Sequence, residues 1–305
     1  MAAAMELKHK GRIREGNPVW TVVLYILAIL AALICIYPMY YVLCMSVSSP
    51  AAVSGLKVYF YPIGLQFNAY KVIIAKPEMW RAYGMTIFYV LVSTTFMLLT
   101  CVLAAFPLAS PNLIGKRAAT IFLLIPMYFS GGLIPSFMVM KMFGLYNNVW
   151  AMIIPHSYSI WYIILTRTYF LSIPETMREA AKIDGASCYQ ILFKIYLPLA
   201  KPILAVVAIY TIVMVWNGWF TAMVYLKDVN LQPLQLYLRR VLVAMTQKLD
   251  KPSTKQEMEL LAKTRLANLS LQYAMIIFTT LPVIFTYPFF QKYFVKGVML
   301  GSLKG

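Results

Sequence analysis

The chain has 305 residues, of which 61% are apolar and only 12% are charged, and its formal net charge is +17. Soluble domains contain about 45–50% apolar and about 25% charged residues. So few charges cannot cover the surface of a soluble protein of this length, which excludes a soluble enzyme and a disordered chain. We therefore expect a multi-pass membrane protein. A basic charge in such a protein reflects topology and anionic lipid more often than nucleic-acid binding.

Six apolar runs have the length of a membrane-spanning helix, which needs about 20 residues. The first run is too long for the apolar part of a signal peptide, so we interpret it as an uncleaved span. Prolines within several runs predict kinks or breaks in the helices. The predicted spans are residues 19–45, 84–109, 118–140, 149–169, 203–226 and 271–290.

Scarce residue types exclude several kinds of chemistry. Two histidines are too few for a histidine metal cluster, and the four cysteines form no CxxC pair, so no metal site is predicted. No GxxxxGK[ST] phosphate loop is present, and the fragment 115–117 lacks its upstream glycine. The chain is therefore expected to have no catalytic residues and no cofactor of its own.

All ten acidic residues lie outside the predicted spans. A self-sufficient ion-coupled carrier usually places a carboxylate within a span, although backbone carbonyls can also bind sodium. A membrane-embedded enzyme would need clustered His, Asp or Cys in the spans, and the sequence has no such cluster. Both classes of protein are therefore disfavoured.

The topology follows from the number of spans and the distribution of charge. Six spans place both termini on one side, and the basic N-terminal tail and the short 115–117 turn favour the cytoplasm. We divide the chain into a cytoplasmic tail (1–18), a transmembrane domain (19–291) and a second cytoplasmic tail (292–305). The outer segment 227–270 contains a capping-box pattern at 254–257, which predicts a short amphipathic helix on the membrane surface or against a partner.

The most polar inward segment, 172–201, predicts two short helices joined by a turn. Ser172, Pro174 and Glu175 have the pattern of a capped helix start, with the helix continuing to Ile183. Glycine at position 185 favours a turn, because it accepts a positive φ. A second helix is expected over residues 186–197. The flanking spans hold this unit at the bilayer, which argues against a DNA-binding helix-turn-helix.

The run Glu179-Ala180-Ala181-x3-Gly185-x9-Ile195-x-Leu197-Pro198 resembles, at every specified position, the EAA loop of ABC-importer permeases. The resemblance implies an all-α integral membrane protein with the type I ABC-importer permease fold, six spans and both termini inside. It also implies that the loop is a cytoplasmic contact with a separate ATPase. The residues expected to make this contact are Glu179, Ala180, Ala181, Asp184, Gly185, Ile195, Leu197 and Pro198.

Weaker features resemble the carbohydrate-uptake permeases of the maltose type. Residues 216–220 are similar to their WN-E-F element but have Gly218 where that family usually has Glu. The stretch 236–240 and the C-terminal ending look most like the subgroup that imports polysaccharide fragments and complex oligosaccharides, including alginate-type systems. In related permeases the tail enters the ATPase dimer, and a frayed tail is the alternative. The tail residues concerned are Gly301, Ser302, Leu303, Lys304 and Gly305.

The resemblance implies a bacterial inner-membrane complex. Its expected partners are a second permease subunit, two copies of an ATPase that holds ATP and magnesium, an extracytoplasmic sugar-binding protein, an oligosaccharide and membrane lipid; nucleic acid is not expected. Substrate-path candidates combine aromatic rings with an amide, although an interfacial aromatic belt or ordinary packing is the favoured explanation. They are Tyr210, Trp216, Asn217 and Trp219.

Two further residues in the spans receive structural roles. His156 has no acidic partner in any span, so a hydrogen-bonded packing role is favoured over a proton relay. Arg167 is expected to extend its charge to the cytoplasmic interface. The sequence thus predicts the permease subunit of an ATP-driven importer of oligosaccharides or polysaccharide fragments. The alternatives are the same kind of importer for a disaccharide or another small solute, and a self-sufficient secondary carrier.

Overall fold

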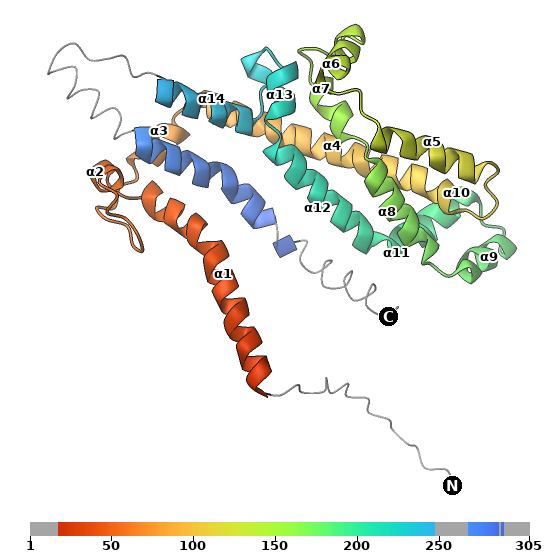
Figure 1. Ribbon diagram of the computed structural model, residues 1–305. Helices are drawn as coiled ribbons and strands as arrows, with labels where there is room; N and C mark the ends of the chain where they lie inside the picture. The colour runs from red at the N-terminus through yellow and green to blue at the C-terminus, as the bar shows by residue number, and fades with distance from the viewer. Residues whose placement is uncertain (1–17, 248–267, 287, 290–305) are drawn as a thin grey trace.

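The computed structural model describes residues 18–247, 268–286 and 288–289, and throughout these ranges the regular structure is helical, without strands. Figure 1 shows the helices as an elongated bundle with one helix, α1, standing apart from it. In chain order the helices are α1 (Pro18–Ser46), α2 (Pro50–Ser54), α3 (Asn68–Ile74), α4 (Pro77–Ala109), α5 (Lys116–Tyr128), α6 (Leu133–Met142), α7 (Trp150–Ile153), η1 (Ile154–His156), α8 (Ile160–Leu171), α9 (Glu175–Ile183), α10 (Cys188–Ile191), η2 (Leu192–Tyr196), α11 (Leu197–Leu199), α12 (Lys201–Asn217), α13 (Phe220–Tyr225), η3 (Val229–Leu231), α14 (Leu234–Gln247) and the helix Asn268–Thr286.

Helix α4, with 33 residues, forms the centre of the bundle. Helices α8 and α12 pack along it (Figure 1), and buried residues recur through its whole length. Proline suits the first turn of a helix, and α4 has Pro77 at this position and Pro107 in its last turn, where few backbone bonds remain to be lost. This one helix therefore connects the two ends of the bundle.

Three helices in the described residues are long and apolar enough to cross a membrane, or five if each of two bent helix pairs counts as one span. The three are Val19–Ser46, Pro77–Ala109 and Asn268–Thr286. The expected all-helical fold is confirmed, whereas the number of six spans stays a prediction. The predicted span 84–109 begins earlier in the structure, at Pro77, because a polar first turn precedes its apolar part.

The predicted span 118–140 is two helices rather than one. Helices α5 and α6 meet at an angle of 113°. The break lies at Gly131 and Gly132, and Gly132 has a φ of +82°, which L-residues with a side chain rarely adopt. Pro126 lies inside α5 without ending it. The expectation that the prolines mark the break is therefore wrong here, because the glycine pair releases the backbone.

The predicted spans 149–169 and 203–226 are also interrupted. The first consists of α7, the 3-10 turn η1 that contains Pro155, and α8. The second is divided at Gly218, where the backbone becomes extended between α12 and α13. Irregular backbone at membrane depth is tolerated where other protein or a water-filled cavity covers it. At the first break Met152, Ile153 and His156 are buried, so other parts of the protein cover it.

Helix α1 makes almost no contact with the rest of the chain. None of the residues in its most apolar stretch is buried, and Figure 1 shows it leaving the bundle at an angle. Only its C-terminal part, from Tyr37 on, is packed. There Cys44 and Met45 join a small core with Ala52, Val53 and Val58. An apolar helix without an intramolecular partner must be covered by lipid or by another subunit.

Helix α14 was not expected from the sequence. It packs against α4, α12 and α13 through the buried residues Leu234, Leu236, Tyr237 and Leu238. Its start is fixed by Thr86 of α4, whose hydroxyl accepts a 2.8 Å hydrogen bond from the backbone N–H of Leu234. The amphipathic helix predicted after residue 254 lies outside the described residues.

The two ends of the bundle differ in structure and are named here for later use. The coupling end holds α9, α10, η2 and α11; the opposite end holds α2, α3, α13 and α14 (Figure 1). At the opposite end the side-chain oxygen of Asn147 accepts hydrogen bonds of 2.9 and 2.7 Å from the backbone N–H groups of Lys227 and Asp228. The loop before α7 is thereby joined to the loop after α13.

Candidate functional site

The first helix of the EAA-like loop is α9, which covers residues Glu175–Ile183 as predicted. Its expected capping box is not formed. The residue before the helix is Pro174, and no side chain caps it. The hydroxyl of Ser172 instead donates a 2.7 Å hydrogen bond to the carbonyl of Tyr169, because Ser172 still belongs to the end of α8. Pro174, whose backbone is extended, separates the end of α8 from the start of α9.

The turn after α9 is a Schellman motif. The backbone N–H of Ala186 donates to the carbonyl of Ala181 at 2.9 Å, and that of Gly185 donates to the carbonyl of Lys182 at 3.0 Å. Gly185 has a φ of +76°, and no atom lies within 4 Å of the place where its Cβ would be. Glycine is needed here for its backbone conformation and not for space within this chain.

The second helix of the loop begins at a capping box that the sequence analysis missed. The Ser187 hydroxyl accepts from the N–H of Gln190 at 3.3 Å, and the Gln190 side chain accepts from the N–H of Ser187 at 2.7 Å. The signal was present as a Ser-x-x-Gln spacing. The helix continues through a π turn, η2, to Leu199 and meets α12 at 75°. It thus ends two residues after Leu197, the last residue of the predicted helix.

Three aromatic rings hold the loop against the spans. Tyr196 of η2 packs edge-on against Phe106 of α4 and Phe170 of α8, with ring centroids 5.2 and 5.4 Å apart. Ala181, Ile195 and Leu197 are half-buried against this cluster. These three positions of the EAA-like pattern therefore face the core of the bundle, and the loop is packed directly on α4 and α8.

Arg178 is a second attachment, and the sequence analysis missed it. Its side chain is only 8% exposed, and one guanidinium nitrogen donates a 2.5 Å hydrogen bond to the hydroxyl of Ser110, which follows the last residue of α4. The sequence signal was an arginine three residues before Ala181, on the same face of α9. The charge lies between the loop and the end of the central helix.

The opposite face of the loop points away from the bundle. Glu179, Ala180, Asp184, Gly185 and Pro198 are exposed. In the described part of the chain, no basic group lies within 4.0 Å of the Glu179 carboxylate. The apolar side chains of Ile183 and Tyr189 are 87% and 73% exposed on this face. A polar loop that presents large apolar side chains has the composition of a protein–protein contact.

The substrate-path candidates are not gathered into one site. Trp216 is buried, and its indole N–H donates to the carbonyl of Thr279 at 3.1 Å, while its ring packs edge-on against Tyr83. Tyr210 and Asn217 are exposed and lie seven residues apart on one face of α12, with exposed Met214 between them. Trp219 is half-buried at the start of α13.

His156 and Arg167 occupy separate sites. His156 is buried, and its Nδ1 lies 2.7 Å from the carbonyl of Met152, so the hydrogen-bonded packing role is observed. A Cβ added to Gly218 would lie 3.9 Å from Nε2 of His156. Arg167 donates a 3.1 Å hydrogen bond from Nε to the carbonyl of Leu108, near the end of α4. Its charge therefore lies at the coupling end.

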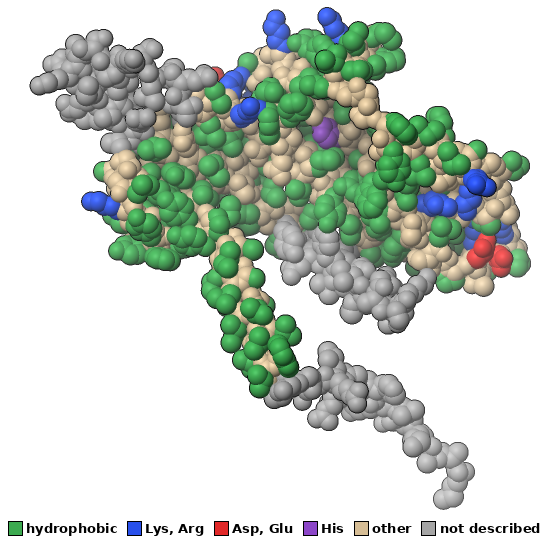
Figure 2. Space-filling model, in the orientation of Figure 1, with side chains coloured by type: hydrophobic (Ala, Val, Ile, Leu, Met, Phe, Trp, Pro, Cys, Tyr) green, Lys and Arg blue, Asp and Glu red, His purple; other side chains and the backbone are tan. Residues whose placement is uncertain are grey.

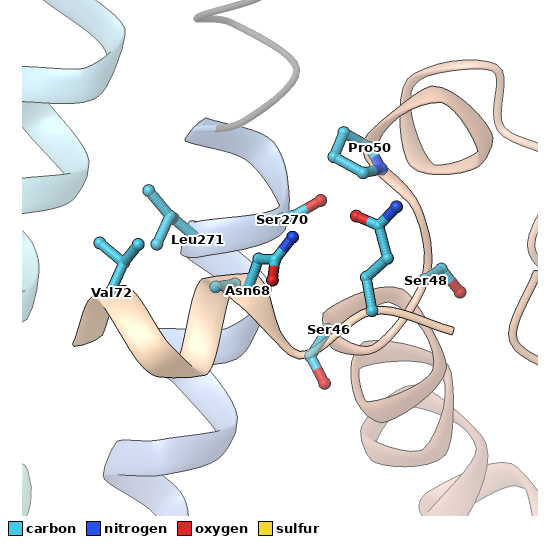
Figure 3. Close-up of a pocket in the computed structure, with 9 residues that line it drawn as sticks. Ser46, Ser48, Pro50, Asn68, Val72, Ser270 and Leu271 are labelled. Carbon is cyan, nitrogen blue, oxygen red and sulfur yellow. The ribbon is translucent and has the colours of Figure 1, made fainter. Parts of the chain in front are cut away.

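The described residues also form a cavity away from the loop and a groove beside it. One, of about 210 Å³, lies between the end of α1, α3 and the helix Asn268–Thr286. Figure 3 shows the Ser270 hydroxyl pointing into it, whereas those of Ser46 and Ser48 turn away. The other is an apolar groove of about 700 Å³ between α4 and the η2–α12 segment, with Leu99, Leu103 and Phe193 in its lining.

Two remaining predictions concern the tail and metal binding. Residues Gly301, Ser302, Leu303, Lys304 and Gly305 lie outside the described residues. Within residues 18–247 and 268–286, His, Cys, Asp and Glu side chains form no group of three that could hold a metal ion.

Comparisons with known proteins agree with this geometry. Residues 73–300 match the family described as "Binding-protein-dependent transport system inner membrane component". The chain is 31% identical to the polygalacturonan/rhamnogalacturonan transport system permease protein YtcP of Bacillus subtilis (strain 168), covering 95% of this chain and 99% of that protein. It is 32% identical to Protein LplC of the same organism, covering 89% and 90%.

A solved structure is similar over nearly the whole chain. It is the crystal structure of a bacterial ABC transporter involved in the import of the acidic polysaccharide alginate, with a TM-score of 0.80 and 34% identity, covering 91% of this chain and 97% of that chain. The type I permease fold and the EAA loop are thus confirmed. The chain belongs to the family of inner-membrane components of binding-protein-dependent transport systems, and it is a multi-pass ABC permease subunit, not an enzyme, with ATP hydrolysis in a separate subunit.

Proposed function

We propose that this permease imports oligosaccharides or polysaccharide fragments, with the EAA loop as the part that transmits force from the ATPase. The observation that carries the proposal is the two-sided loop: one face is packed on α4 and α8, and the other presents Glu179, Ile183 and Tyr189 to a partner. Because the loop is packed on α4 and α8, a partner that displaces the loop also displaces these two helices. ATP and magnesium belong to that partner.

The exposed face of the loop suits a close contact with another protein. Small Ala180 and Gly185 let another backbone approach, and the Glu179 carboxylate suits an arginine across the interface. Two such loops, one from each permease of a heterodimer, would engage two ATPase copies. Their closure would bring the loops together and shift the spans between inward-open and outward-open states. The C-terminal residues 301–305 form a second contact with the ATPase in this proposal.

The companion permease is supported by the surface of α1. This helix is apolar on all sides yet unpacked against its own bundle, while an apolar groove of about 700 Å³ lies open beside α4. In a heterodimer α1 of each subunit would lie against the other subunit. The proposal also includes six spans with both termini in the cytoplasm, which puts the coupling end inside and the opposite end outside, facing the sugar-binding protein.

The substrate class is supported by the relatives. YtcP is named for polygalacturonan and rhamnogalacturonan, and the similar solved transporter takes part in alginate import. The exposed face of α12 with Tyr210, Met214 and Asn217 is the best-placed lining for a sugar path, since rings and amides suit sugar C–H faces and hydroxyls. Other relatives import smaller sugars, as the lactose permease LacG of Rhizobium radiobacter does, so a disaccharide is the second candidate.

The test uses the complete complex in proteoliposomes with its binding protein. Glu179→Lys reverses the charge at an exposed position, so the variant should fold and insert but lose ATP-driven oligosaccharide uptake by at least tenfold. Lys182→Ala is the matched control, because it alters another exposed residue of α9. Uptake by Glu179→Lys at the unaltered rate would contradict the assignment of the loop.

A further inference from the structure

At the opposite end of the bundle, an arginine lies over the ring of a tryptophan. The guanidinium carbon of Arg239 in α14 lies 3.7 Å from the ring centroid of Trp219, at the start of α13. This contact restricts the guanidinium, and one of its nitrogens also donates a 3.4 Å hydrogen bond to Sδ of Met223. The remaining N–H groups are available to bind an anion. Because Arg239 occupies one face of the ring, Trp219 acts here as a positioning residue.

A second arginine lies next to the first. Arg240 donates a 2.9 Å hydrogen bond to the side-chain oxygen of Gln232, and its guanidinium lies 5.7 Å from the Tyr237 ring centroid. Both arginines line one cavity of about 410 Å³, whose remaining wall is mostly apolar. In the parts of the chain that the structure describes, neither guanidinium has a carboxylate within 4.0 Å.

The whole opposite end is basic. Its described segments, 47–83, 141–149 and 218–247, contain eight Lys and Arg residues against two acidic residues, Glu78 and Asp228. Figure 2 shows lysine and arginine side chains over this part of the surface, with little acidic surface between them. Such a field attracts anions and raises their local concentration. The eight are Lys57, Lys71, Lys76, Arg81, Lys141, Lys227, Arg239 and Arg240.

We propose that Arg239, positioned by Trp219, and Arg240 form a carboxylate-binding site for acidic sugar units entering the permease. The inference rests on the proposed function and names its substrate class as oligosaccharides that carry uronate carboxylates. Two forked guanidinium groups match carboxylate geometry, and the apolar wall beside them suits the C–H face of a sugar ring. A neutral sugar of the same shape gains nothing from these two charges.

The experiment compares trigalacturonate with its fully methyl-esterified form, which has the same sugar backbone but a neutral methyl ester in place of each carboxylate. ATP-driven uptake is measured in proteoliposomes that contain the complete complex and its binding protein. The double variant Arg239→Gln/Arg240→Gln should raise KM for trigalacturonate about tenfold, with kcat and all ester kinetics within twofold of the original values. Trp219→Leu should raise the same KM by a smaller factor, and Arg239→Lys should only partly replace the arginine.

Arg81→Gln is the matched control. Arg81 is an exposed arginine of the same end that hydrogen-bonds Asn230 instead of lining the cavity. It removes one charge from the field and none from the cavity, so it should raise KM for trigalacturonate less than twofold and leave ester kinetics unchanged. Equal losses for acid and ester in the double variant would overturn the proposal, because they would indicate a structural role or a contact with the binding protein. Uptake of neutral oligosaccharides alone by the unaltered complex would also overturn it, while leaving the permease function intact.

A lipid headgroup offers the same anionic chemistry and is distinguished by vesicle composition. The effect of the double variant on trigalacturonate should be the same with and without phosphatidylglycerol. A loss that appears only with anionic lipid, and equally for both probes, would assign the arginines to lipid and contradict the proposal. Absence of ATP-driven uptake of any oligosaccharide by the unaltered complex would instead refute the proposed function.

Discussion

At the scale of single residues, two buried serine hydroxyls near the end of α1 differ in their hydrogen bonds. The difference determines how much stability each serine contributes to the fold. Ser48 is buried, donates a 2.6 Å hydrogen bond to the carbonyl of Cys44 and accepts a 3.1 Å bond from the N–H of Ile63. Ser270 is also buried but has no partner within the described residues. Ser48 therefore ties the loop after α2 to α1, whereas the Ser270 hydroxyl contributes no bond.

Alanine at these two positions should have different effects. Ser48→Ala leaves the N–H of Ile63 without its acceptor and should destabilise the protein by about 1–2 kcal/mol. Ser270→Ala removes only an unpaired hydroxyl and should change stability by less than about 0.5 kcal/mol. Thermal unfolding of the two purified variants in one detergent measures the difference. A larger loss for Ser270→Ala than for Ser48→Ala would contradict this bonding pattern.

Arg178 is the residue whose loss should separate ATP use from transport. Arg178→Ala removes a charge-assisted hydrogen bond to Ser110, a contribution of about 1.5–3 kcal/mol, and loosens the loop from α4. The complex should still hydrolyse ATP while importing less sugar for each ATP consumed. The ratio of uptake to hydrolysis in proteoliposomes measures this. An unchanged ratio would show that the aromatic cluster alone carries the connection.

At the scale of elements, the turn between α9 and α10 depends on one backbone conformation. A residue with a branched side chain at a φ of +76° is strained, so Gly185→Val should cost at least about 1–2 kcal/mol and distort the loop. Asparagine tolerates this conformation, so Gly185→Asn should retain most of the folding stability. Thermal unfolding compares the two variants. Equal stability would show that the turn does not need the left-handed conformation.

Much of the helical framework was predictable from hydropathy and length. The predicted span 19–45 corresponds closely to α1, and α9 has the expected bounds, because apolar runs and strong turn residues mark these ends. The break after α5 was expected at a proline and lies at a glycine pair, and the break after α12 was not predicted. An apolar segment satisfies a hydropathy criterion whether it is straight or broken, and the bend of 113° comes from a glycine pair and tertiary packing.

The sequence identifies the residues of the candidate site but not which of them face the bundle and which are exposed. The EAA-like residues were found, yet the structure divides them into inward positions, such as Ala181 and Leu197, and outward positions, such as Glu179. Spacing alone does not show which face packs on the bundle. Arg178 and Ser187 were missed, because the importance of each depends on a specific partner: Ser110 for the first and Gln190 for the second.

At the scale of the whole molecule, the position of α1 predicts a heterodimer contact. Photo-crosslinkers placed singly along residues 26–36, where the large apolar side chains are exposed, should join this chain to its companion permease. Adducts should recur with a helical period of about 3.6 residues, since only one face touches a partner. Absence of protein adducts at every position would show that lipid alone surrounds α1.

The central claim is that this chain is a membrane subunit driven through its loop by a separate ATPase. The most direct test is affinity purification of the chain from native membranes in mild detergent, followed by mass spectrometry. The account predicts recovery of a P-loop ATPase and a second permease with an EAA loop, and loss of the ATPase alone from the Glu179→Lys variant. Recovery of the unaltered chain without any ATPase, under conditions that preserve related complexes, would contradict it.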